Sequence, residues 1–344
     1  DQISRLKLVV QLEEVPSKEG ALSWAAFLAS GLEQKPLDVF SKRGANSAGI
    51  TTATILYTSG TTGRPKGVPL SHENLLHQIK ALACVANPPV ASPVLSVLPI
   101  WHSYERSAEY FFFSCGCTQN YTSIKHLKND LPRVRPIVMA TVPRLWEAVK
   151  QGFDDALKSM PSPRRRILKN ALANSLIHKR AVRTLKGFLI EKVSPSQRAK
   201  ALVEAVLRWP VHMVAKTLLW PKVLDKLCGG RLLFPINGGG AIAPDVDAFF
   251  EAIGVEMLVG YGLTETSPVV SCRRPWKNIR GTAGEPLPET EFKIVDLKNG
   301  SLMQFREKGR VLVKGPQVMN GYLGKPQATA KVLSKDGWFD TGDI

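Results

Sequence analysis

The chain has 344 residues, of which 44% are apolar and 22% charged, so it can bury a large core and is not disordered as a whole. Lys and Arg number 46 against 29 Asp and Glu, and the formal net charge of +17 predicts an anionic partner: a nucleotide, a nucleic acid, a lipid surface or an acidic protein. Five scattered cysteines without a C-x-x-C pair exclude a disulfide framework and a zinc ribbon, and favour a reducing compartment.

The first predicted elements are short. An apolar run at residues 6–12 precedes an expected helix at residues 22–32, and residues 41–49 are rich in Gly, Ser and Asn, as loops are. The β-branched run ATILYT at residues 53–58 predicts a strand buried on both faces. Ser71 is a good N-cap residue, so we expect a helix to begin directly after it.

The longest stretch without Asp, Glu, Lys or Arg covers residues 81–104. It is long enough to cross a bilayer, but its four prolines would break a helix and leave backbone polar groups unsatisfied in lipid. We therefore expect a loop that leads into a buried strand at residues 94–98. The chain begins with Asp1 and shows no signal or transit segment, so we expect it to be a piece of a longer protein.

The rest of the chain alternates short β-branched runs with amphipathic segments. This alternation predicts an α/β fold with a mostly parallel sheet. The expected strands are residues 137–141, 231–237, 255–259, 292–296 and 310–314, and the expected helices include residues 144–153 and 244–253.

The surplus of basic residues is local. Residues 158–226 hold 16 Lys and Arg against three Asp and Glu, which accounts for +13 of the +17. Apolar residues recur there at near-helical spacing, and Trp209 and Trp220 each precede a proline that we expect to kink or end a helix. A basic amphipathic pair of helices with tryptophans predicts an element that binds a membrane surface or handles an acyl chain. A solvated helical insertion packed on the main domain is the alternative.

A Gly- and Thr-rich loop, residues 58–67, lies between an expected strand and an expected helix. Its glycines expose backbone N–H groups, its hydroxyls add donors, and Lys66 adds a cation, all of which suit a polyphosphate. It is not a Walker A loop, because Pro65 and Gly67 flank the lysine. From the residues alone, a structural turn is as compatible as a phosphate clamp.

Three further motifs follow expected strands. Residues 237–241 contain three glycines that permit close approach of a flat ligand, and residues 260–266 place Tyr261 and Glu265 where they could stack on a base and hold Mg²⁺. Asp343 could accept hydrogen bonds from two vicinal ribose hydroxyls. We therefore expect one Mg-ATP pocket at the carboxyl edge of a sheet.

The motifs YTSGTTGRPKGV, the GGGA turn, GYGLTETSP and GWFDTGD occur in the order and approximate spacing of the adenylate-forming (AMP-binding) superfamily. The resemblance covers the chain from about Thr52 to its last residue. LPIWHSYERSAEY, VPRLWEAV and WPVHMVAKTLLW resemble the long-chain fatty acyl branch. RRPWKNIRGTAG, TEFKIVD and GPQVMNGY look most like the plastid and cyanobacterial acyl-[acyl-carrier-protein] synthetases, also called acyl-activating enzymes.

The resemblance implies a fold and a domain organisation. Residues 1–344 would form an incomplete AMP-binding domain, the large N-terminal domain of the adenylate-forming fold. It would have mostly parallel sheets flanked by helices, a small β subdomain, and residues 158–226 as a basic insertion. The C-terminal lid, which carries the family's catalytic lysine and hinge, would follow the last motif and be absent. We therefore expect the chain alone to bind ATP weakly and to adenylate poorly.

The resemblance also implies an activity. A long-chain fatty acid would attack the α-phosphate of ATP with Mg²⁺, and the acyl-adenylate would pass its acyl group to the phosphopantetheine thiol of acyl carrier protein. Coenzyme A is the alternative acceptor. By resemblance we expect a plastid (chloroplast) location, with peripheral membrane contact through residues 158–226 and no nucleic-acid partner.

Site residues carry over from the matching motifs. The resemblance implies catalytic roles for Lys66, Thr264, Glu265 and His102, with Glu265 binding Mg²⁺. The residues expected to contact ATP are Thr58, Ser59, Gly60, Thr61, Thr62, Lys66, Gly239, Gly240, Ala241, Tyr261, Gly262, Thr264 and Asp343.

Some residues in or near these motifs also have a purely structural interpretation. His102 would lie near the carboxylate and the acyl tunnel, or it is a satisfied structural histidine. Glu105 and Arg106 are expected to form an ordinary ion pair. The cysteines need no catalytic role, since no side-chain nucleophile is required.

A function of another class is a non-catalytic basic protein that binds a membrane or a nucleic acid. The basic segment lacks the interleaved aromatic residues that stack on bases, which argues against a nucleic acid. Unchanged Mg-ATP binding and activity after Glu265→Ala would favour this alternative.

Overall fold

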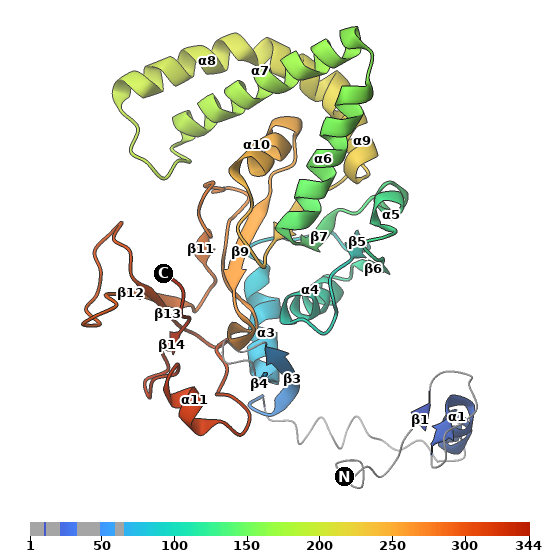
Figure 1. Cartoon of the computed structure of the whole chain (residues 1–344), viewed down its shortest axis with the longest axis vertical. Helices are drawn as coiled ribbons and strands as arrows, with labels where there is room; N and C mark the ends of the chain where they lie inside the picture. Colours follow the sequence, from blue (N-terminus) through green and yellow to red (C-terminus); the bar gives the residue numbers. More distant parts are fainter. Residues whose placement is uncertain (1–9, 12–20, 33–48, 59–64) are drawn as a thin grey trace. The chain divides into compact units, whose positions relative to one another are not determined.

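The computed structural model divides the chain into two compact units, residues 1–49 and residues 50–344. We describe each unit by itself. The residues that the structure describes are 10–11, 21–32, 49–58 and 65–344 (Figure 1).

The first unit contains two short strands and a helix. Strands β1 (Val10–Gln11) and β2 (Leu22–Ser23) pair in parallel, and α1 (Trp24–Leu32) follows β2 directly. The helix predicted in this region is therefore confirmed. The predicted apolar run at 6–12 and loop at 41–49 lie mostly outside the described residues.

The second unit is built on a seven-stranded sheet (Figure 1). Its strands are β5 (Pro93–Ser96), β6 (Thr118–Tyr121), β7 (Val138–Thr141), β8 (Phe234–Asn237), β9 (Leu258–Gly262), β10 (Val269–Cys272) and β11 (Glu285–Pro286). They are arranged in the order β11-β10-β9-β8-β7-β5-β6. Strands β5, β6, β7, β8 and β9 are parallel to one another, and β10 runs antiparallel to both of its neighbours, β9 and β11. The predicted α/β fold with a mostly parallel sheet is confirmed.

Helices cover both faces of this sheet, because neighbouring residues of each strand point to opposite sides. Val94 and Val138 pack with α3 (His72–Leu82) and α4 (Ser103–Ser114). Leu95 and Met139 pack with the helices of the other face, which are α5 (Leu127–Val134), α6 (Pro143–Ser159) and α10 (Pro244–Ile253). The strand ends that carry the motifs thus emerge from a core that is closed on both sides.

A smaller β region lies beside this sheet. Strand β3 (Thr52–Thr58) pairs with β4 (Lys66–Ser71), and β12 (Glu291–Val295), β13 (Arg310–Lys314) and β14 (Phe339–Asp340) form an antiparallel sheet with α11 (Pro326–Ala330) nearby. The two sheets share one core, to which Leu56, Val68, Val313 and Phe339 contribute.

The prediction that residues 53–58 are buried on both faces is wrong. Ile55 is 42% and Tyr57 68% exposed, whereas Leu56 between them is 7% exposed. The reason is that, among the described strands, β3 pairs with β4 alone in a two-stranded sheet, and only one of its faces meets the core.

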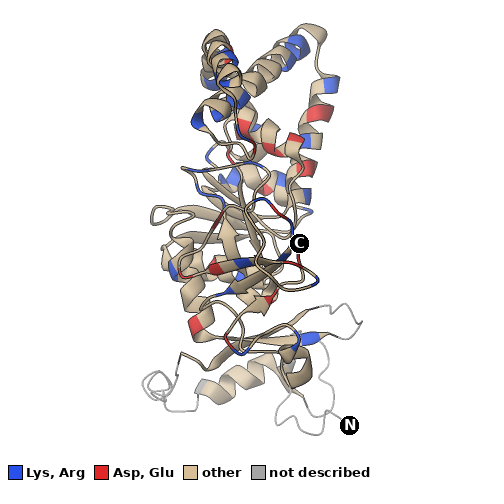
Figure 2. Cartoon of the chain, turned by 90° about the vertical axis from the view of Figure 1, so that its left-hand side faces the viewer, with Lys and Arg blue, Asp and Glu red and all other residues tan. Residues whose placement is uncertain are grey.

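The basic segment is helical. It comprises α7 (Ser162–Lys186), α8 (Pro195–Val214), the π-helix η2 (Ala215–Leu219) and α9 (Trp220–Cys228). Helices α7 and α8 pack against each other, and Lys and Arg are numerous on these helices (Figure 2). None of the helices in the described ranges has the length and apolarity that crossing a bilayer requires.

The prolines of this segment behave differently from each other. A new helix begins at Trp220, with Pro221 in its first turn, as expected. At Trp209 only one of the two predicted outcomes, the end of the helix, is excluded, because α8 continues through Pro210 to Val214. The carbonyl that Pro210 leaves without a helical donor belongs to Val206, which is 62% exposed and accessible to water.

Candidate active site

A cavity of about 320 Å³ lies at the carboxyl ends of β8 and β9, beside the start of α4. Its buried walls are mostly apolar and include Leu82, Phe111, Phe112, Ile236 and Val269, beside the buried Ser103 and Ser107. Its more exposed walls come from the predicted motifs, and six predicted site residues line it: His102, Gly239, Tyr261, Gly262, Thr264 and Glu265. One cavity therefore joins polar groups at its exposed walls to an apolar interior.

Glu265 is held in place from a different part of the chain. It lies in the 3₁₀ turn η3 (Thr264–Thr266), and its carbonyl accepts a hydrogen bond of 2.8 Å from the Met319 amide. Its Oε1 accepts a second bond of 2.8 Å from the Tyr322 hydroxyl. Burial and the adjacent carboxylate raise the pKa of Tyr322, so its hydroxyl stays protonated as a donor.

Lys66 reaches the same cluster. It is the first residue of β4, and its Nζ lies 4.8 Å from the centroid of the Tyr322 ring. The backbone supports this approach, because the Leu323 amide donates a 2.9 Å bond to the Gly67 carbonyl. A lysine, a tyrosine and a carboxylate thus converge, which is the charge arrangement that a metal-bound polyphosphate requires.

Tyr261 and Asp343 also meet across the sequence. The Tyr261 hydroxyl donates a hydrogen bond of 2.6 Å to Asp343 Oδ2. Burial, with Asp343 beside it, raises the pKa of Tyr261. The structure therefore brings together two residues for which the sequence predicts contacts with one nucleoside.

The other predicted residues that the structure describes do not line the cavity. Gly240 and Ala241 follow β8 but are exposed and do not line it. Thr58 pairs with Lys66 across β3 and β4. Ser59, Gly60, Thr61 and Thr62 lie outside the described residues.

The family model described as "AMP-binding enzyme" matches residues 2–323. The chain belongs to the AMP-binding enzyme family. Among curated proteins, it is 45% identical over 301 residues to "Probable acyl-activating enzyme 16, chloroplastic" of Arabidopsis thaliana, covering 85% of this chain and 41% of that protein. It is 43% identical over 300 residues to "Long-chain-fatty-acid–[acyl-carrier-protein] ligase AEE15, chloroplastic" of the same plant, covering 85% and 41%. The chain thus spans about two fifths of the length of these relatives.

Two further matches are more distant. The chain is 32% identical to "Long-chain-fatty-acid–CoA ligase 2" of Schizosaccharomyces pombe, covering 84% of this chain and 40% of that protein. A solved structure of the N-terminal domain of FACL13 from Mycobacterium tuberculosis matches with a TM-score of 0.60 at 19% identity, covering 94% and 63%. At this identity the second likeness shows the fold alone.

Sequence reasoning missed two tyrosines of this AMP-binding enzyme. Tyr104, in the LPIWHSYER motif, lines the cavity and donates a 2.9 Å bond to the Ile236 carbonyl. A Cβ at Gly238 would lie 3.1 Å from the Tyr104 ring, so a glycine makes room for this ring. Tyr322 ends the GPQVMNGY motif, which served only to identify the family branch. Both tyrosines could have been predicted as site residues, because each lies within a motif that resembles the family.

His102 has a structural role in this AMP-binding enzyme as well as a place on the cavity wall. It is the N-cap of α4, where its Nδ1 accepts a 3.2 Å bond from the Tyr104 amide. Desolvation lowers the pKa of His102, which favours the neutral imidazole.

The prediction that Glu105 and Arg106 form ordinary ion pairs is wrong. Among the described residues neither side chain takes part in an ion pair. Arg106 donates a 2.6 Å bond to Thr54 Oγ1. Glu105 is 1% exposed and points away from water, and burial raises its pKa to about 7.

The residues present fit Mg-ATP. Within the described ranges no group of three or more His, Cys, Asp or Glu side chains could hold a metal ion, so Glu265 would be a single protein carboxylate on the metal. Mg²⁺ commonly binds in this way, with its other ligands from phosphate and water. The Tyr322 hydroxyl donates its hydrogen bond to Glu265 Oε1. Among the described residues Glu265 Oε2 has no hydrogen-bond partner, so this oxygen would be the one that binds the metal.

Proposed function

We propose that this AMP-binding enzyme activates a long-chain fatty acid. The carboxylate oxygen attacks the α-phosphorus of ATP, the bond to the β-phosphate breaks, and pyrophosphate leaves, which gives an acyl-adenylate. A thiolate then attacks the acyl carbon and AMP leaves. The observation that carries the proposal is the single cavity in which Tyr261, Thr264 and Glu265 stand over an apolar interior.

The predicted site residues, in the cavity wall and outside it, would act by positioning and by balancing charge. Lys66, with Thr58, Ser59, Gly60, Thr61 and Thr62, would hold the β- and γ-phosphates and the departing pyrophosphate. Thr264 would contact the α-phosphate, Glu265 would hold Mg²⁺, and the metal would offset charge on the phosphate oxygens. Gly239, Gly240, Ala241, Gly262 and Tyr261 would surround the adenine, and Asp343 the ribose. Neutral His102 would stand beside the fatty-acid carboxylate without repelling it.

We propose acyl carrier protein as the acceptor, with coenzyme A as the alternative. The printed name of one relative that is 43% identical supports the first, and that of a 32% identical relative the second. The test supplies palmitate, Mg-ATP and each acceptor separately to the natural protein that carries this chain, and detects the thioester by mass spectrometry. A thioester with the carrier protein is expected; product with coenzyme A alone would remove the carrier-protein assignment, and no thioester with either would remove the proposed function.

A second proposal concerns the membrane. We propose that residues 158–226 are an insertion in the AMP-binding domain that contacts a membrane surface. Four neighbouring apolar residues of α8 are more than half exposed: Leu202, Val203, Val206 and Leu207. Arg198 and Lys200 lie on the same helix, and apolar residues next to basic ones are typical of interfacial helices.

The membrane proposal is tested by co-sedimentation with vesicles that contain anionic lipid. Leu202→Ser with Leu207→Ser should reduce binding at least several-fold, because the change removes apolar area but no charge. Undiminished sedimentation would contradict it. The names of the two plant relatives also support a chloroplast location for this protein, which fractionation of plant cells would test.

A further inference from the structure

A groove runs between α7 and α8, separate from the active-site cavity. It consists of two hollows of about 640 Å³ and about 600 Å³, and Ile177 and Arg208 line both of them. The two hollows are therefore adjacent parts of one groove, which we call the α7–α8 groove. None of its lining residues lines the active-site cavity.

One end of the groove is basic. Five cationic side chains line the larger hollow, against the two carboxylates of Glu191 and Glu204, and these cations are Arg180, Lys192, Lys200, Arg208 and Arg280. Within the described part of the chain, the first four form no ion pair. An anion bound here would therefore meet cations that are not already neutralised by neighbouring carboxylates.

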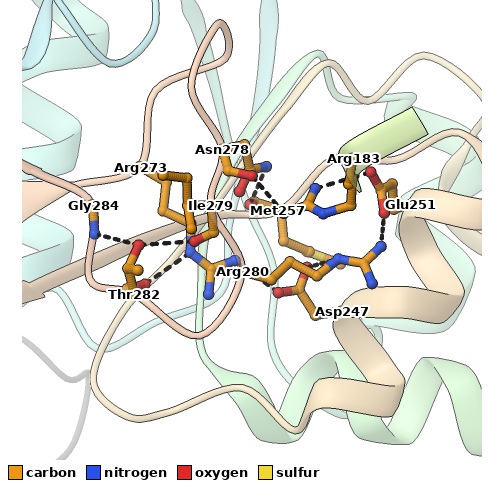
Figure 3. Close-up of polar contacts among 10 residues, drawn as sticks. All are labelled: Arg183, Asp247, Glu251, Met257, Arg273, Asn278, Ile279, Arg280, Thr282 and Gly284. Atoms are coloured by element: carbon orange, nitrogen blue, oxygen red, sulfur yellow. Dashed lines mark hydrogen bonds and ion pairs between the residues drawn. The ribbon is translucent and has the colours of Figure 1, made fainter. Parts of the chain in front are cut away.

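Arg280, whose side chain is 24% exposed, joins this end to a buried cluster of two other arginines and two carboxylates (Figure 3). Arg183 pairs with Glu251 at 3.0 Å, and Arg273 pairs with Asp247 at 2.7 Å, all four side chains being less than a tenth exposed. Arg280 contacts both carboxylates as a third guanidinium, which leaves one positive charge uncompensated. Burial lowers the pKa of Arg280 to about 10, and its buried Nε has no hydrogen-bond partner in the described ranges.

The other end of the groove is mainly apolar. Ile167, Ile177, Val211, Val214 and Leu219 line the smaller hollow, with three alanines and the polar side chains of Asn170, Asn174 and Arg208. Ile167, Val211 and Val214 are each more than half exposed, so they leave apolar surface uncovered. From residue 167 to residue 184, which line opposite ends, α7 rises about 26 Å. That length is comparable with a long, extended hydrocarbon chain.

We propose that the α7–α8 groove is a second fatty-acid site, outside the active-site cavity. The carboxylate would lie at the basic end, within reach of Arg208 and Arg280. The hydrocarbon chain would lie along Ile177, Val211 and Val214. The basic and apolar ends point to an anionic amphiphile with one long chain, and the choice of a carboxylate as its head group rests on the proposed function.

The test measures binding of radiolabelled oleate by equilibrium dialysis, without ATP and below the micelle concentration. The groove variant is Arg208→Gln with Val211→Ser. Its matched control makes changes of the same kind at exposed positions of α7 that do not line the groove, Arg166→Gln with Leu185→Ser. All four side chains are exposed, so both variants should fold.

We expect two oleate molecules per wild-type and control chain, and at least a tenfold loss of affinity for one of them in the groove variant. Unchanged binding in the groove variant would overturn the proposal. So would equal binding of oleyl alcohol, because the basic end would then have no part. Tighter binding of lysophosphatidate would assign the groove to a phosphate head group instead. If the protein binds oleate in the groove but shows no palmitate-dependent adenylation, the proposed function is wrong and the groove proposal stands.

Discussion

Two regions of the sheet domain bury carboxylates, one of them beside arginines and the other, within the described ranges, without a cationic partner. On α10, Asp247 and Glu251 face arginines, with Asp247 2.7 Å from Arg273 (Figure 3). On α4, Glu105 is equally buried, but neither of its oxygens has a hydrogen-bond partner among the described residues.

The difference teaches that partners, and not burial alone, decide whether a buried acid keeps its charge. Burial, reinforced by Glu109 and partly offset by Ser96, raises the pKa of Glu105 to about 7. The carboxylates of α10 instead balance guanidinium groups that would be unpaired without them. The same change from acid to amide should therefore have opposite effects on stability in the two regions.

The largest expected effect is that of Asp247→Asn. It should lower the free energy of unfolding by about 4 kcal/mol, because it leaves the buried Arg273 without its counter-charge. Urea denaturation measures the change. The control is Asp155→Asn, which breaks an exposed pair with Lys158 and should change nothing measurable. A loss below 1 kcal/mol for Asp247→Asn would show that the buried pair does not stabilise the fold.

The opposite sign is expected for Glu105→Gln. The folded-state pKa of Glu105, about 7, is raised above the ordinary 4.5, so between these values the folded chain holds a proton that the unfolded chain has lost. Stability should therefore fall as the pH rises from about 4.5 to about 7. Glutamine cannot ionise, so the variant should be more stable by roughly 3 kcal/mol at pH 8 and equal near pH 4. Denaturation curves that show the same dependence on pH for both proteins would contradict this account.

The third prediction concerns Gly262→Ala, which changes no charge and therefore tests how packing alone affects stability. A Cβ at Gly262 would overlap the Pro268 carbonyl, so Gly262→Ala should cost about 2 kcal/mol in thermal denaturation and distort the cavity wall. The control is Gly152→Ala on α6, where the added Cβ would have no described atom within 4 Å apart from the backbone of its own helix. It should stabilise the chain by up to about 1 kcal/mol. Equal effects of the two changes would show that the close approach at Gly262 is absent.

The smallest expected effect concerns a carboxylate at the cavity. Tyr322→Phe removes one hydrogen bond to Glu265 and should reduce fatty-acid activation about tenfold, which corresponds to roughly 1.4 kcal/mol. The concentration of Mg²⁺ needed for half-maximal rate should rise as well, since Glu265 would be less firmly placed. An unchanged dependence on Mg²⁺ would show that Tyr322 does not position this carboxylate.

Much of the fold and of the cavity could be predicted from the sequence because local patterns encode them. The β-branched run at residues 310–314 became β13 with the same limits, and the motifs at residues 260–266 reached the same cavity as His102. In a short motif at a strand end, the same few residues supply the functional groups and determine that these groups lie at the edge of the sheet.

What could not be predicted depends on partners far away in the chain. Glu105 was expected to form an ordinary ion pair, and nothing in its own stretch of sequence shows that α4 buries it. The pair of Arg183 with Glu251 joins residues 68 positions apart, and the bond of Tyr322 with Glu265 spans 57. The burial of β3 was overestimated because composition does not show how many strands pair with it.

The central claim is that the protein uses Mg-ATP to convert a fatty acid to its acyl-adenylate in the cavity at the ends of β8 and β9. The most direct measurement is the palmitate-dependent exchange of labelled pyrophosphate into ATP, in the natural protein that carries this chain and in its Glu265→Gln variant. We predict exchange that requires palmitate and falls at least about 100-fold in the variant, with its thermal denaturation unchanged. Exchange that is independent of palmitate, or that a folded Glu265→Gln variant retains in full, would contradict the claim.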